Sequence, residues 1–164
     1  MTVDNVGNGL PIHANFILGR FFITSSASIH ATMNLFSFLR QHADQIGGQF
    51  TDYDHTKGVI VIPVTKSRFQ TILVTLKPSQ YSGKDLVMFT SKVCEYTSAV
   101  NTKELLEENN TFDYARFMIE DGYVKIEASC VAATAAEDHI KEMLDEVANV
   151  ADRFELDITG QDVY

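Results

Sequence analysis

Residues 112–131 read FDYARFMIEDGYVKIEASCV, and this stretch decides the fold more clearly than any other part of the chain. Asp121-Gly122 is typical of a two-residue hairpin turn, because both residue types tolerate the positive φ that such a turn requires. The flanking segments 112–119 and 123–131 are therefore predicted to be antiparallel strands. The expected apolar face consists of Ile119, Val124, Ile126 and Ala128. The expected solvent-exposed face consists of Arg116, Glu120, Lys125 and Glu127.

A long amphipathic helix is predicted to follow this hairpin. Thr134 and Glu137 have the spacing of a capping box, and Gly160 is a suitable terminator. Apolar residues recur at spacings of four, three, four and three, which places them on one face of a helix. They are Ile140, Leu144, Val147, Ala151 and Phe154. This seam has two interpretations, packing on the sheet or contact with a partner subunit.

Upstream of the hairpin, the sequence predicts one helix, four strands and a short second helix. Serines at 25, 26 and 28 offer N-caps for a helix that ends at Gly47-Gly48, and its apolar positions fall at helical spacing. Strands are expected at 50–53, 58–63, 69–76 and 85–96, and a capped helix at 102–109. Short turns between consecutive strands imply antiparallel pairing. The order helix, strands, helix, two strands, helix predicts an α+β two-layer domain with a mostly antiparallel sheet.

The chain is expected to consist of an N-terminal extension, residues 1–24, followed by a single domain, residues 25–164. The extension contains an apolar stretch with Phe21 and Phe22, which we expect to pack on the domain or on a partner subunit. Together with the helical seam, these two phenylalanines are the candidate partner or dimer surface.

Charge is distributed unevenly along the 164 residues, of which 45% are hydrophobic and 21% charged. Residues 1–100 have a formal balance of +2 and residues 101–164 one of −11, giving the net charge of −9. An acidic chain repels phosphate backbones, so we expect no nucleic-acid partner. The acidic half is interpreted as a solvated surface or as a landing surface for a basic partner segment.

Neither a secretory signal nor a membrane span is expected from the sequence. The N-terminus lacks a basic region leading into an apolar stretch, and the apolar runs are far shorter than a bilayer requires. We therefore predict a cytoplasmic protein without membrane contact, in which Cys94 and Cys130 are reduced and packed.

The motifs that carry most enzyme chemistry do not occur in the sequence. There is no phosphate-binding loop, no Gly-x-Ser-x-Gly elbow and no Cys-x-x-Cys pair. The histidines at 13, 30, 42, 55 and 139 are scattered and are expected to be exposed rather than metal ligands. Adjacent carboxylates such as Asp145-Glu146 point in different directions on a helix, and no calcium loop is present. We expect no catalytic residues, no cofactor and no metal.

The segments 112–128 and 140–154 resemble those of the YbjN-type proteins, whose fold is that of the type III secretion chaperones. The family pattern is a strand, an Asp-Gly-like turn, a second strand and a closing helix, and the element order over residues 26–158 also fits. The resemblance implies a compact homodimer that holds a partly unfolded client or a regulatory partner without ATP and without catalysis.

Three hypotheses of function follow. The first is a non-catalytic protein-binding module, chaperone-like or regulatory, that acts as a homodimer. The second is a small-molecule sensor with a pocket between sheet and helices. The third is an enzyme with a site built from scattered residues, for which His139 or Asp85 is a candidate.

Overall fold

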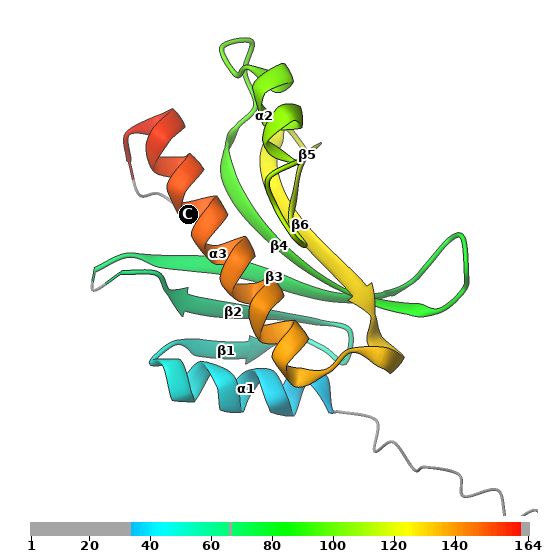
Figure 1. Cartoon of the computed structure of the whole chain (residues 1–164). Coiled ribbons are helices and arrows are strands. Elements are labelled where there is room, and N and C mark those ends of the chain that lie inside the picture. Colours follow the sequence, from blue (N-terminus) through cyan, green and yellow to red (C-terminus); the bar gives the residue numbers. More distant parts are fainter. Residues whose placement is uncertain (1–33, 66, 162–164) are drawn as a thin grey trace, which may run out of the picture. The chain divides into compact units, whose positions relative to one another are not determined.

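The structure is a computed structural model, and it describes residues 34–65 and 67–161. The elements in chain order are α1 (Leu35–Ile46), β1 (Gln49–Asp52), β2 (Lys57–Pro63), β3 (Phe69–Pro78), β4 (Asp85–Glu95), α2 (Thr102–Glu108), β5 (Arg116–Glu120), β6 (Tyr123–Val131), the 3-10 turn η1 (Ala132–Thr134) and α3 (Glu137–Thr159). Figure 1 shows α3 crossing the sheet as a single long helix. This order of elements confirms the predicted α+β class. The predicted extension, residues 1–24, lies outside the described residues.

One six-stranded sheet forms the frame of the domain. Its strand order is β1-β2-β3-β4-β6-β5, and all neighbouring strands are antiparallel. The predicted hairpin turn is present, because Asp121 and Gly122 both have positive φ, 53° and 78°, and Glu120 lies opposite Tyr123. β3 and β4, the two longest strands, occupy the centre, and the short strands β1 and β5 form the edges.

The helices α1 and α3 pack on a single face of the sheet. On that face Ile72 and Phe89, from the two central strands, share a core with Leu39 of α1 and Leu144 of α3, and all four are fully buried. Burial of each such side chain contributes about 1.5–3 kcal/mol to folding. Opposite residues of antiparallel strands point to the same side, and successive residues alternate. The other face of the sheet, called the open face below, is covered by none of the described helices.

The start of the last helix differs from the prediction. α3 begins at Glu137 with Ala136 as its N-cap and without a side-chain cap, whereas Thr134 belongs to η1 and donates its hydroxyl to the Val131 carbonyl. The chain needs this short turn to pass from β6 into α3. Glu137 and Asp138 then lie in the first turn, where carboxylates interact favourably with the helix dipole. Gly160 ends the helix with φ 67°, as predicted.

Strand β5 begins at Arg116, four residues later than expected. The backbone N–H groups of Asp113, Tyr114 and Ala115 donate to the carboxylate of Glu146 on α3. These three donors are satisfied by a side chain, so this part of the chain does not extend the strand.

Two side chains of the hairpin have burial opposite to the expectation. Glu127 was expected to be wet but is 4% exposed, because Arg116 Nη2 lies 2.6 Å from its Oε1 and covers it. Ile119 was expected to face the core but is 48% exposed, because β5 is an edge strand and Ile119 lies near its end. Val124, Ile126 and Ala128 are fully buried as predicted.

Within the described residues, no helix combines the length and the apolar character needed to cross a bilayer.

Candidate functional site

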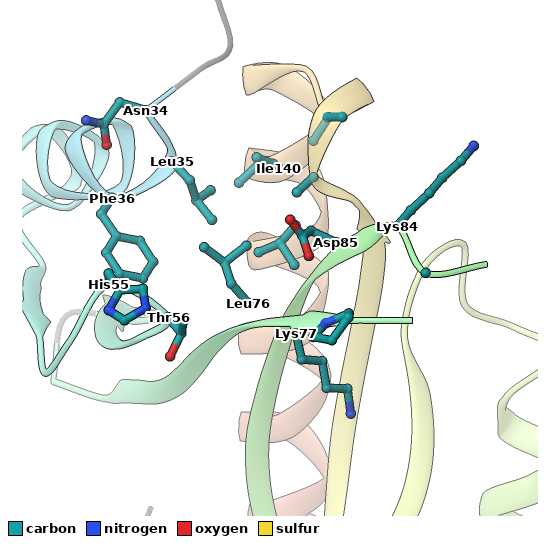
Figure 2. A pocket seen from close by; sticks show the side chains of 16 residues that line it. Asn34, Leu35, Phe36, His55, Thr56, Leu76, Lys77, Lys84, Asp85 and Ile140 are labelled. Atoms are coloured by element: carbon teal, nitrogen blue, oxygen red, sulfur yellow. The ribbon is translucent and has the colours of Figure 1, made fainter. Parts of the chain in front are cut away.

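An apolar groove opens where the first turn of α1 faces the ends of the central strands and the start of α3. Its volume is about 840 Å³. Its apolar lining consists of the half-buried Leu35, Phe36, Leu76 and Ala135, with the fully buried Val87 and Ile140 beneath them. Figure 2 shows Leu35, Leu76 and Ile140 directed into the space between α1 and the sheet. The groove can therefore accept apolar side chains from one open side.

Local structure explains why these elements meet. The Asn34 side chain accepts a hydrogen bond from the Ser37 amide at 3.2 Å, which fixes Leu35 as the first residue of α1. Across the groove, the Leu76 amide donates to the Thr56 carbonyl at 2.7 Å and ties the β1–β2 loop to the end of β3. The side chains of Leu35 and Leu76 are thus set by a helix cap and a strand end.

Polar groups lie at the rim of the groove rather than in its wall. His55, Lys77, Lys84 and Asp85 contribute to the lining, but Figure 2 shows Lys77 and Lys84 pointing away from the centre. No hydrogen bond or ion pair between described residues joins the side chains of these four. The rim can hold a polar backbone or a charged flank of a ligand, while the wall supplies apolar contact.

The helical seam that was a candidate partner surface is instead the inner face of α3. Ile140, Leu144, Val147 and Ala151 are fully buried against the sheet. Of the two interpretations, packing on the sheet is the one the structure has, and these four side chains are not available to a partner. Phe154 is half-buried and packs on Phe117, with ring centroids 4.8 Å apart. Phe21 and Phe22 lie outside the described residues.

The open face of the sheet carries apolar side chains that sequence reasoning did not single out. Leu73 on β3 lies opposite both Val59 and Thr90 and is 41% exposed. Phe69, at the start of the same strand, is 47% exposed. The alternation of side chains along a strand places positions 69, 71, 73 and 75 on one face of β3. The continuous apolar runs in β2 and β3 did not indicate which of the two faces would be buried.

A buried polar cluster links the two central strands beneath α3. Gln70 Nε2 donates to Ser91 Oγ at 2.9 Å and to the Lys92 carbonyl at 3.2 Å, and Ser91 donates to the Thr71 carbonyl. Nearby, burial raises the pKa of the Cys94 thiol, and Glu155 raises it further. A thiol held in its neutral form is a poor nucleophile, so Cys94 acts as a packed side chain, as predicted.

The histidines divide by burial in a way the sequence did not indicate. His42 was expected to be exposed but is 7% exposed and stacks on Phe38, with ring centroids 6.0 Å apart. Burial lowers the pKa of His42, which favours the neutral imidazole. His139 lies against the Tyr114 ring at 5.0 Å, and His55 is exposed at the groove. Over residues 34–65 and 67–161, no group of three His, Cys, Asp or Glu side chains is placed to hold a metal ion.

No protein-family model and no curated protein sequence matches this chain. The resemblance of residues 112–128 and 140–154 to the YbjN-type proteins stays a prediction.

Proposed function

We propose that the protein is a non-catalytic binding module, chaperone-like or regulatory, that acts as a cytoplasmic homodimer and holds apolar segments of a client protein in the groove. The observation that carries this proposal is the groove itself, whose accessible apolar wall is formed by the half-buried side chains of Leu35, Phe36 and Leu76. Apolar anchors of an extended or helical peptide bind to grooves of this kind. The YbjN-type resemblance points to the same function.

The acidic helix α3, whose first turns lie next to the groove, favours clients with basic flanks. It carries eight acidic and two basic residues, with Glu137 and Asp138 in its first turn. Opposite charges on two partners raise the rate of their association, and like charges disfavour the binding of other proteins. A client segment with apolar anchors between lysines or arginines therefore fits this surface best.

Because the chain contains no Trp, a peptide with a single Trp reports its own binding by fluorescence. The peptide would contain Leu, Phe and its one Trp at alternate positions between lysine flanks. The full-length protein would be titrated into it. The expected result is a saturable blue shift with a dissociation constant on the order of micromolar. The absence of a shift with the wild-type protein would contradict the proposal.

A matched pair of variants assigns the binding to the groove. Leu35→Glu places a carboxylate in the groove wall, yet the first turn of a helix tolerates it well. Ser37→Glu adds the same charge to the same turn at an exposed position that does not line the groove. We expect Leu35→Glu to weaken peptide binding at least about tenfold and Ser37→Glu to leave it nearly unchanged. Equal binding by both variants would place the peptide elsewhere.

A small-molecule sensor is the second candidate, and the size of the groove favours it. A volume of about 840 Å³ lies within the range of pockets that hold small ligands. A ligand present at about 100 times its dissociation constant stabilises the folded state by about 2.7 kcal/mol. A compound that raises the melting temperature saturably and displaces the Trp peptide would favour this candidate over protein binding.

A further inference from the structure

The open face has a charged end and an apolar middle. At the end formed by β6 and β5, long side chains pair with one another: Arg116 with Glu127, Lys125 with Glu120 at 2.8 Å, and Lys92 over the Tyr123 ring at 3.9 Å. These pairs cover the strands beneath them. Solvation of one face is normal for an antiparallel sheet, so this end does not by itself indicate a partner.

The middle of the open face differs, because apolar side chains meet there across three strands. Val59 of β2 lies opposite Leu73 of β3, and Pro63 lies opposite Phe69. On the other side of β3, Met88 of β4 lies opposite Thr75. Contiguous exposed apolar surface of this kind marks an interaction site more often than chance. We call the five apolar residues among them the apolar middle: Phe69 and Leu73, which are exposed, and Val59, Pro63 and Met88, which are half-buried.

The charge distribution indicates which partner fits. The helix layer is strongly acidic, with a balance of −8 over α2 and α3. The strand residues that point to the open face include Lys57, Lys77, Lys92, Arg116 and Lys125 but only Glu95, Glu120 and Glu127. Two copies with a net charge of −9 each repel one another less when they meet through this face, whose strand residues have a balance of only +2, than through their acidic helices.

The size of the open face also suits a contact between two copies. Six strands about 4.8 Å apart, with a mean length of roughly 26 Å, span about 700 Å². Contact between two such faces would bury on the order of 1,400 Å², which is within the range of stable protein interfaces. A two-fold contact brings the same patch of both copies together, so the apolar middle would be buried against itself.

We infer that the occupant of the open face is a second copy of this chain, with Leu73 near the centre of a two-fold contact. This inference rests on the homodimer of the proposed function and adds the surface through which it forms. It replaces the inner face of α3, which is buried in the core, as the dimer surface. The groove lies on the helix-covered side of the sheet, so both copies keep it accessible to clients.

The test is the mass of the full-length protein by size-exclusion chromatography with light scattering. Wild type is expected at twice the 18.3 kDa of one chain. Leu73→Glu places an unpaired charge in both halves of the contact and is expected to raise the dimer dissociation constant at least about a hundredfold. Leu156→Glu on α3 is the matched control, because Leu156 is 42% exposed and Leu73 is 41% exposed. This control is expected to remain a dimer.

Each outcome supports or overturns a defined part of the account. Monomeric wild type would overturn both the homodimer and its surface, and would leave the open face to another occupant. Dimeric Leu73→Glu would overturn the surface and leave the homodimer standing. If circular dichroism shows Leu73→Glu to be unfolded, Thr71→Arg takes its place, since Thr71 is an exposed neighbour on the same face. Dissociation of that folded variant supports the inference, and its persistence as a dimer refutes it.

Discussion

The carboxylate of Glu146 holds the backbone of Tyr114, with Oε2 2.7 Å from the Tyr114 amide nitrogen. The same side chain also accepts from the amides of Asp113 and Ala115, each at 2.8 Å. One residue of α3 therefore fixes the entry into β5 and determines where that edge strand begins.

Glu146→Gln is expected to destabilise the fold by about 1–3 kcal/mol, because an amide has one acceptor oxygen and presents an NH₂ group to the remaining donors. Urea denaturation followed by circular dichroism measures the change. Glu142→Gln is the control, because among the described residues Glu142 accepts a hydrogen bond from the Tyr114 hydroxyl alone, at an exposed site, and a smaller loss is expected. Equal losses of unfolding free energy in the two variants would show that the three backbone hydrogen bonds to Glu146 stabilise the fold no more than the one side-chain bond to Glu142.

Gly122→Ala is expected to cost about 1 kcal/mol or more, although a Cβ at this position would meet no atom within 4 Å. The cost comes from φ 78°, which side chains with a Cβ rarely adopt. Gly122→Asn should lose less, because Asn tolerates the left-handed region better. Thermal unfolding of both variants checks the ranking, and a neutral Gly122→Ala would contradict the turn geometry.

Acidification is expected to destabilise the protein through His42. Burial lowers the folded-state pKa of His42; Asp145 raises it and Lys141 lowers it by smaller amounts. The unfolded chain therefore binds a proton at a pH where the folded chain does not, so stability is lost as pH falls through about 6.5. Urea denaturation at pH 7.5 and 5.5 should show a larger loss for wild type than for His42→Leu. An identical pH dependence would exclude His42 as the cause.

The two thiols are expected to react slowly and at different rates. Burial raises the pKa of both, and Glu155 further raises that of Cys94, which is 4% exposed, whereas Cys130 is half-buried. With a disulfide reagent at pH 8, Cys130 should react first, and Cys94 at least about tenfold more slowly than in the unfolded chain. Rapid modification of native Cys94 would contradict its packing in the core.

Elements whose signals are local could be predicted from the sequence. The Asp121-Gly122 turn fixes its own conformation, and the bounds of β6 match the predicted strand 123–131. The end of α1 at Gly47 and of α3 at Gly160 follows from the same chemistry, since both glycines have positive φ. The fold class follows from the order of such elements.

Features that depend on contacts distant in the sequence could not be predicted. The late start of β5 is set by Glu146, more than thirty residues along the chain. The burial of Glu127 needs Arg116, and the burial of His42 needs the packing of α1. The periodicity of the apolar residues in α3 predicted the helix and its buried face correctly. Periodicity alone does not show whether the sheet or a partner subunit covers that face. A pocket between sheet and helices was part of one hypothesis, but its lining could not be predicted, because it comes from separate elements, Leu35, Leu76 and Ile140 among them.

The central claim is that the protein binds unfolded polypeptide through the groove, and fluorescence anisotropy of a labelled client tests it most directly. The client would be a basic protein such as lysozyme, kept unfolded by reduction and by carbamidomethylation, which adds no negative charge, and it would be compared with its native form. The account predicts a saturable rise with the unfolded client, none with the native one, and a loss of binding in Leu35→Glu but not in Ser37→Glu. No rise at protein concentrations up to about 100 μM, or an equal rise with both forms of the client, would contradict it.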